Sequence, residues 1–142
     1  MPATAIHRIT PCFFVPDPDA SAAFYRDKLG FVVAERFGEA PGQSVFVILD
    51  FGPVSLFLRR VTAGYGVRPE MPPGAPPLFD AYIHVGDVDA LHETIAATGT
   101  AVEPPTEQPY GVREIAVTDP DGYRVVFGQD HGGPPVNRLD DV

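Results

Sequence analysis

The sequence predicts an α+β fold, in which two tandem βαβββ modules form a curved mixed sheet around a pocket. The first observation is an internal repeat. The segments Val15-Pro-Asp-Pro-Asp-Ala20 and Val85-Gly-Asp-Val-Asp-Ala90 share the pattern V-x-D-x-D-A, 70 positions apart, and the register then continues through Leu29-Gly30 opposite Thr98-Gly99. The second is that strand-like and helix-like patterns follow one another in the same order in both halves. Such self-similarity indicates a duplicated structural unit.

In the first half, residues 8–15 form an extended segment, which a helix follows. Asp17 or Asp19 is a suitable N-cap and Gly30 a suitable stop. Runs rich in Val, Ile and Phe then predict three short strands. We place these strands at residues 31–36, 44–49 and 54–59, with a tight turn at Phe51-Gly52-Pro53.

The second half repeats this order, beginning with an extended segment at residues 79–85. Asp87 or Asp89 is the expected N-cap of its helix, and Gly99 the expected stop. Three strands follow, at residues 101–104, 113–118 and 123–127, with a tight turn at Pro120-Asp121-Gly122.

We expect one domain, because 142 residues are too few for two independently stable domains of ordinary size. The domain spans residues 1–128, with modules at about 7–60 and 78–128. A linker rich in Gly and Pro occupies 61–77, and a loose tail occupies 129–142. A linker of this kind can act as a lid over a cavity or let the halves exchange between two chains.

Composition restricts the partners and the compartment. The formal net charge of −9 disfavours nucleic acid; it favours cationic ligands, and it also simply keeps a protein in solution. Neither a membrane helix nor a signal peptide is visible, so we expect a cytoplasmic protein without membrane contact. The single cysteine, Cys12, cannot form an internal disulfide and is interpreted as a small core residue.

The two modules, with the segments Phe24-Tyr25-Arg26-Asp27, Leu29-Gly30-Phe31 and Asp119-Pro120-Asp121-Gly122-Tyr123, resemble the vicinal oxygen chelate superfamily. This superfamily includes glyoxalase I, extradiol dioxygenases and bleomycin-resistance proteins. The resemblance covers about residues 7 to 128 and implies the glyoxalase/bleomycin resistance fold.

Enzymes of that superfamily hold a divalent metal on four strand positions. The resemblance places these positions at Thr10, Phe57, Asp80 and Val126. Only Asp80 is a plausible ligand among them, whereas a divalent ion needs about three or more protein donors. We therefore expect no metal and no other cofactor. A metal held by Asp80 and His84 is the weaker alternative.

The chain is most similar to the metal-free bleomycin-resistance proteins, homodimers that sequester a cationic antibiotic in aromatic grooves. Val54–Leu58 resembles their fourth strand. Glu107-Gln-Pro-Tyr-Gly111 with Arg113-Glu114 resembles their Q-P-W-G-R-E segment, with Val112 as an added residue. Because the chain has no tryptophan, the resemblance implies that Tyr82, Tyr110 and His84 supply the stacking surface.

Strand alternation places Asp80, Tyr82 and His84 on one face, which is either a pocket wall or an ordinary half-exposed strand face. Phe57 either lines the same concavity or belongs to the core, and Arg113 either lies at the pocket rim or extends to solvent. The candidate ligand-binding residues are Phe14, Phe57, Asp80, Tyr82, His84, Tyr110 and Arg113. No catalytic residue is assigned.

Three hypotheses follow. The first is a non-catalytic homodimer that sequesters a small organic ligand, such as a cationic or aromatic natural product or antibiotic, and thereby confers resistance. The second is a metal-dependent lyase, isomerase or dioxygenase of the same superfamily, or a metal-independent enzyme with His84 or Asp80 as general base. The third is an accessory or carrier subunit of a biosynthetic pathway.

Overall fold

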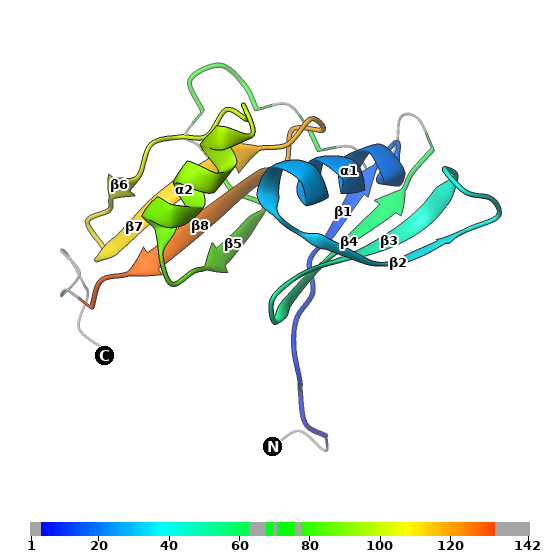
Figure 1. Ribbon diagram of the computed structural model, residues 1–142, viewed down its shortest axis with the longest axis horizontal. Coiled ribbons are helices and arrows are strands. Elements are labelled where there is room, and N and C mark those ends of the chain that lie inside the picture. The colour runs from blue at the N-terminus through cyan, green and yellow to red at the C-terminus, as the bar shows by residue number, and fades with distance from the viewer. Residues whose placement is uncertain (1–3, 63–67, 70, 76–77, 133–142) are drawn as a thin grey trace. The chain divides into compact units, whose positions relative to one another are not determined.

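The computed structural model describes residues 4–62, 68–69, 71–75 and 78–132. The chain divides into two compact units, the first carrying strands β1 to β4 and the second carrying strands β5 to β8 (Figure 1). Each unit contains one helix and one four-stranded mixed sheet. This is the predicted α+β fold of two tandem βαβββ modules.

The first unit is built from β1 (Cys12–Val15), α1 (Pro18–Leu29), β2 (Val32–Gly38), β3 (Ser44–Phe51) and β4 (Val54–Arg60). Its strands lie in the order β1-β4-β3-β2. The pairing of β1 with β4 is parallel, and the other two pairings are antiparallel.

The second unit repeats this topology with β5 (Ala81–His84), α2 (Val88–Ala97), β6 (Thr106–Glu107), β7 (Val112–Thr118) and β8 (Arg124–Asp130). The strand order is β5-β8-β7-β6, and again only the first pairing is parallel. A parallel pair needs a crossover connection, which α1 and α2 supply in their respective units.

The repeated aspartates begin the two helices. The Asp17 carboxylate accepts hydrogen bonds from the backbone N–H groups of Asp19 and Ala20, at 3.1 and 3.2 Å. Asp87 accepts from the N–H of Ala90 at 3.0 Å. These caps satisfy donors that have no partner inside the helix. Of the two predicted candidates in each half, the structure therefore selects Asp17 and Asp87.

Each helix covers one face of its own sheet, and apolar side chains fill the layer between them. In the first unit this face carries Phe13, Val15, Val47, Leu49 and Leu58, all buried, and the Phe13 ring lies 6.5 Å from that of Tyr25 on α1. In the second unit the buried strand residues are Ile115, Val117, Val125 and Phe127, with Val88 and Ile95 on α2. The opposite face of each sheet is called its open face below.

The structure differs from the prediction at the strand expected at residues 101–104. The described backbone there is irregular, and β6 comprises only Thr106–Glu107. The N–H of Glu103 does donate to the carbonyl of Ala116 at 3.1 Å. Pro104 and Pro105 follow directly and lack N–H groups, so they interrupt the ladder along β7.

The last strand also ends later than predicted, because β8 continues to Asp130 instead of ending at residue 127. Residues 63–67, 70 and 76–77 of the predicted linker lie outside the described residues, as do residues 133–142 of the predicted tail. None of the helices in the described part of the chain is long and apolar enough to cross a membrane.

Candidate functional site

The open face of the second sheet combines aromatic and acidic side chains. Tyr82 and His84 are two residues apart on β5 and therefore point to the same face, where their ring centroids lie 5.1 Å apart. In the strand register His84 is the neighbour of Gly128 on β8, which in turn is the neighbour of Glu114 on β7. Tyr82, His84 and Glu114 therefore share this face.

Gly128 leaves room for the Tyr82 side chain to cross β8. A Cβ atom added to Gly128 would lie 1.9 Å from the Tyr82 hydroxyl oxygen and 2.5 Å from its Cζ. The phenol thus lies directly over a residue without a side chain. A glycine inside a strand often marks such a close approach.

The turn between β6 and β7 brings Tyr110 to the same place. Gly111 has a φ of 82°, and the N–H of Gly111 donates to the carbonyl of Gln108 at 3.1 Å. The left-handed backbone favours glycine at this position. The Tyr110 hydroxyl donates to Glu114 Oε1 at 2.7 Å. Glu114 Oε2 is buried and, among the described residues, has no hydrogen-bond partner.

This carboxylate affects both phenols. Burial raises the pKa of Tyr82 most, and the nearby Glu114 carboxylate with its negative charge raises it further. Burial, followed by the hydrogen bond to Glu114 and the charge of that residue, raises the pKa of Tyr110 to about 12. Negative charge beside a phenol disfavours a second negative charge on its oxygen. Both tyrosines are therefore neutral hydrogen-bond donors at physiological pH.

A hollow of about 380 Å³ lies against this face and is formed entirely within the second unit. Its floor includes Ala116 and Val126, which are apolar. Arg124 lines it as well, in an ion pair with Glu103 at 2.7 Å. The remaining polar lining residues are Glu114, Thr106 and Gln108. An apolar floor with a few polar groups is typical of small-molecule sites.

Asp80 was predicted to line the pocket wall. In the structure its Oδ2 accepts from Arg68 Nε at 2.6 Å and from the backbone N–H of Arg124 at 2.8 Å. It therefore holds the start of β8, and the Arg68 guanidinium occupies it.

The residues at the four family metal positions do not fit a divalent ion. Phe57 and Val126 offer only hydrocarbon, Thr10 offers a neutral hydroxyl, and Asp80 already binds two donors. Across the described ranges, no group of three or more His, Cys, Asp and Glu side chains lies close enough together to hold a metal. No reaction step is therefore assigned to a metal.

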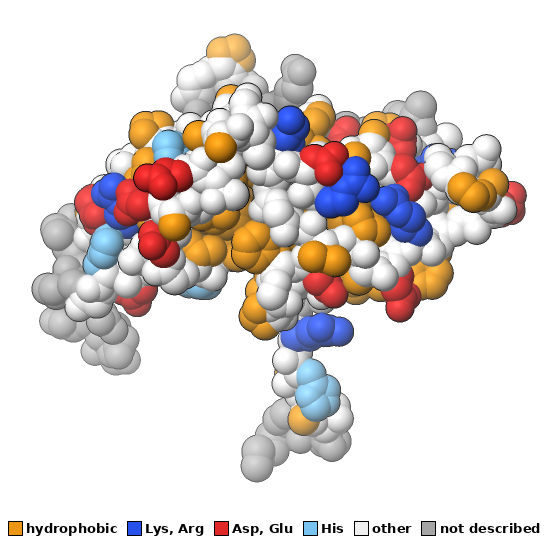
Figure 2. Space-filling view, in the orientation of Figure 1, with side chains coloured by type: hydrophobic (Ala, Val, Ile, Leu, Met, Phe, Trp, Pro, Cys, Tyr) orange, Lys and Arg blue, Asp and Glu red, His pale blue; other side chains and the backbone are white. Residues whose placement is uncertain are grey.

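Arg113 differs in placement from the expectation of a pocket rim. It lies on the helix-facing side of β7, with its Nη2 2.8 Å from Asp89 Oδ1 on α2 and its Nη1 3.2 Å from Glu107 Oε1. Figure 2 shows acidic and basic side chains lying together beside α2. Side chains alternate along β7, so Arg113 shares the helix-facing side with the buried Ile115 and Val117. Glu114 lies on the open face with Ala116.

The first unit carries the other two candidates. Phe57 is the register neighbour of Cys12, and Phe14 is the neighbour of Arg59. The Phe57 ring packs 5.1 Å from Phe46 on the open face of that sheet. Phe14 is 41% exposed. This face thus carries aromatic rings beside Arg59, whereas the open face of the second unit carries aromatic rings beside a carboxylate.

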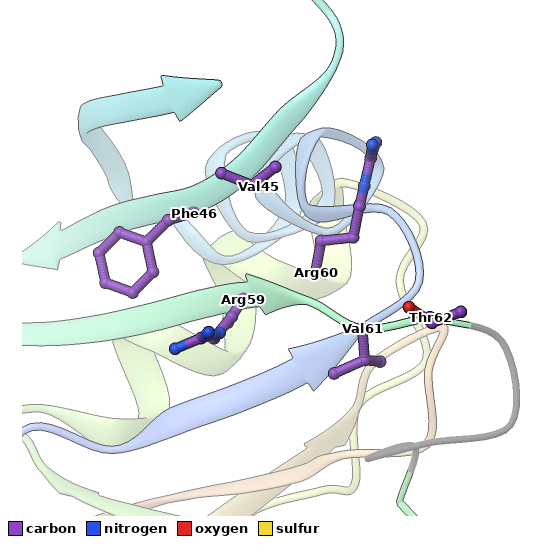
Figure 3. A pocket seen from close by; sticks show the side chains of 6 residues that line it. All are labelled: Val45, Phe46, Arg59, Arg60, Val61 and Thr62. Carbon is purple, nitrogen blue, oxygen red and sulfur yellow. The ribbon is translucent and has the colours of Figure 1, made fainter. Parts of the chain in front are cut away.

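A second hollow, of about 450 Å³, lies in the first unit where β3 begins and β4 ends. Figure 3 shows that Phe46 and Arg59 point to one side of the sheet, whereas Val45 and Arg60 point to the other. The two arginines therefore do not converge on one ligand position. This hollow carries no site.

The structure thus brings Tyr82 and Tyr110 to Glu114 in the second unit, with His84 beside Tyr82, and places Phe14 and Phe57 on the open face of the first. Arg113 and Asp80 belong to neither group of side chains, because Arg113 is ion-paired with Asp89 and Asp80 is ion-paired with Arg68. Sequence analysis did not single out Glu114 or Gly128. A glycine between Phe127 and Gln129 in a strand was the available signal for the second.

The family model of the Glyoxalase/Bleomycin resistance protein/Dioxygenase superfamily matches residues 5–127. No curated protein sequence gives a significant match.

Solved structures of similar fold include proteins of several kinds. The bleomycin-binding protein from the bleomycin producer Streptomyces verticillus, solved with copper(II)-bleomycin, is 29% identical with a TM-score of 0.64, over 87% of this chain and 96% of that one. A lactoylglutathione lyase from Agrobacterium tumefaciens is 26% identical with a TM-score of 0.60, over 91% and 96%. A glyoxalase/bleomycin resistance protein/dioxygenase from Nocardioides is 25% identical with a TM-score of 0.65, over 97% and 93%.

Proposed function

Because the chain belongs to the glyoxalase/bleomycin resistance protein/dioxygenase superfamily, we propose that it binds a small organic molecule and sequesters it chemically unchanged. The observation that carries the proposal is the open face of the second unit. There Tyr82 and Tyr110 lie near the Glu114 carboxylate and His84 packs against Tyr82, beside a hollow of about 380 Å³. Aromatic rings provide stacking area, and the apolar floor excludes water.

The bleomycin-binding protein of Streptomyces verticillus supports a ligand of natural-product type, because it covers most of the chain at 29% identity. This chain has no tryptophan, and tyrosine and histidine rings offer less stacking area. We therefore propose a flat or amphipathic natural product smaller than bleomycin. Sequestration of a toxic compound would give its producer or its target organism resistance.

We further propose that the chain acts as a homodimer. A contiguous row of rings on the open face of the first unit supports this, because Phe37 packs 6.0 Å from Phe46 and Phe46 packs 5.1 Å from Phe57. Phe14 and Phe37 on this face are 41% and 47% exposed. Contiguous exposed apolar patches often mark protein–protein interfaces. Light scattering on a size-exclusion column should then give twice the chain mass of 15.3 kDa. A monomer at micromolar concentration would contradict this part of the proposal.

A thermal-shift screen tests the binding function. The panel contains cationic and aromatic natural products, with metal-free and copper(II)-loaded bleomycin among them. A ligand at 100 times its dissociation constant should stabilise the fold by about 2.7 kcal/mol. Each compound that raises the melting temperature is then recovered after overnight incubation and examined by mass spectrometry and by NMR spectroscopy, which distinguishes isomers of equal mass. An unchanged mass and an unchanged NMR spectrum support sequestration, and a panel without any shift contradicts it.

The match to the lactoylglutathione lyase of Agrobacterium tumefaciens favours an enzyme as the second candidate function. It is separated from the first by the same recovery step, because an enzyme returns a product of different structure. Phe57 and Val126 disfavour a metal-dependent mechanism, since they occupy two of the four expected metal positions and neither side chain has a donor atom.

A further inference from the structure

We infer that the hollow of the second unit recognises a protonated nitrogen, of the amidine, guanidine or amine class, through Glu114. This inference rests on the proposed binding function and names the chemical class of its ligand. It begins from one unsatisfied atom, Glu114 Oε2, which is buried and has no hydrogen-bond partner among the described residues. Leaving a charged acceptor without a partner is unfavourable, and a donor arriving with a ligand would remove that cost.

The surroundings of Glu114 favour a cation over a neutral donor. Three charged side chains line the hollow, and two of them, Arg124 and Glu103, neutralise each other at 2.7 Å. Glu114 forms no ion pair with any described residue, and its hydrogen-bond donor Tyr110 is a neutral phenol. Asp130 adds negative charge near Tyr82 on the same face. A cation entering the hollow would therefore meet uncompensated negative charge.

The geometry allows a planar cation to contact both the aromatic rings and the Glu114 carboxylate. Gly128 lies between His84 and Glu114 in the register, and the Tyr82 phenol crosses over that glycine, so an aromatic group can contact the rings while its nitrogen reaches the carboxylate. The terminal torsion of a glutamate side chain is broad, so a small rotation turns a carboxylate oxygen toward the hollow. A charge-assisted bond of this kind is stronger than a neutral one. Aromatic faces also attract cations directly.

The test uses benzamidine as the cationic probe and benzamide as its neutral counterpart, each titrated by ligand-observed NMR. The wild-type chain should bind benzamidine at least tenfold more tightly than benzamide, a difference of about 1.4 kcal/mol. In Glu114→Gln, benzamidine affinity should fall at least tenfold while benzamide affinity changes less than threefold. Circular dichroism and the melting temperature check that the variant is folded.

Glu93→Gln is the matched control, because it removes an equal charge from the second unit at a position outside the hollow. Glu93 is exposed on α2, which covers the opposite face of the sheet. Its replacement should change benzamidine affinity less than threefold. Equal affinity of the wild-type chain for both probes, no benzamidine binding at 10 mM, or an unchanged affinity in a folded Glu114→Gln variant would each overturn the inference. Natural products that still bind in the thermal-shift screen would show that the proposed function survives this failure.

Discussion

Glu114 and Tyr110 form a hydrogen-bonded pair whose chemistry makes the stability of the chain sensitive to alkaline pH. The phenol donates to the carboxylate at 2.7 Å. Burial and this neighbour hold the pKa of Tyr110 at about 12, above its ordinary value of 10.0. A raised pKa stabilises the fold fully below the unfolded value, and this contribution is lost as pH rises through the folded value.

Tyr110→Phe should therefore make the decline of stability with pH less steep. In the wild-type chain the free energy of unfolding should fall between pH 10 and pH 12, because the unfolded tyrosines ionise first. The Tyr110→Phe variant lacks one of the phenol groups whose ionisation causes this fall. Urea unfolding at intervals of half a pH unit measures this, and tyrosinate absorbance at 295 nm follows ionisation in parallel. Identical pH dependence in both chains would contradict the interaction with Glu114.

Gly128 makes a second residue-scale prediction, because the Tyr82 phenol occupies the space of its missing side chain. Gly128→Ala places Cβ 1.9 Å from the Tyr82 hydroxyl, so the ring must move away from Glu114. We expect a loss of about 1–3 kcal/mol, typical of overpacking. Urea unfolding of a double-mutant cycle with Tyr82→Ala isolates the clash. In the Tyr82→Ala background the alanine should cost nothing or stabilise, and an equal cost in both backgrounds would exclude this packing.

At the scale of elements, Asp19 holds helix α1 to its own sheet. Its carboxylate accepts from the backbone N–H of Ser44 at 2.8 Å and from the Ser44 hydroxyl at 2.7 Å, and it pairs with Arg36. Burial alone would raise the pKa of Asp19, but the bonds from Ser44 and Arg36 lower it overall. One carboxylate thus joins the first turn of α1 to β2 and β3.

Asp19→Asn should lower the free energy of unfolding at pH 7 by about 1–3 kcal/mol, because hydrogen bonds to a charged group are lost. Glu39→Gln, which neutralises an exposed carboxylate near the end of β2, should leave it within about 0.5 kcal/mol. Because the pKa of Asp19 is lowered, its contribution is present above pH 3.8 and disappears as pH falls below that value. Urea unfolding at pH 7 and pH 3 measures both effects. A loss that persists undiminished at pH 3 would contradict the charged interaction.

The elements themselves were largely predictable from the sequence, because their signals are local. The repeated aspartates cap both helices, and Gly30 ends α1 in the left-handed conformation with a φ of 83°. The strand predicted at 101–104 is absent. The prediction relied on apolar composition, whereas Pro104 and Pro105 have no N–H groups to donate to a neighbouring strand. Strand alternation correctly paired Tyr82 with His84 on one face.

The site was harder to predict, because its members meet through register. Arg113 was assigned to the pocket from its sequence neighbours, yet the phase of β7 after Val112 turns it to Asp89 on α2. Glu114 becomes part of the site only when β7 is aligned with β8 and the Tyr110 turn is closed. No periodicity within one segment contains that information.

At the scale of the whole molecule, duplication has given two sheets of equal topology with open faces of different chemistry. The first unit offers phenylalanines, and the second offers tyrosine, histidine and a carboxylate. The net charge of −9 adds a general attraction for cations, which salt should weaken. The rings, the carboxylate and the net negative charge together support the proposal that the chain binds an aromatic cation.

We propose that the chain binds its organic ligand without the divalent metal that enzymes of this superfamily use. The most direct test is the metal content of the chain purified without chelators, with its melting temperature measured before and after addition of Zn²⁺, Mn²⁺, Fe²⁺ or Ni²⁺. We predict less than about 0.1 metal per chain and no thermal shift, because Phe57 and Val126 carry no donor atoms. About one tightly bound metal per chain would contradict this proposal and would favour the metal-dependent enzyme of the second candidate function.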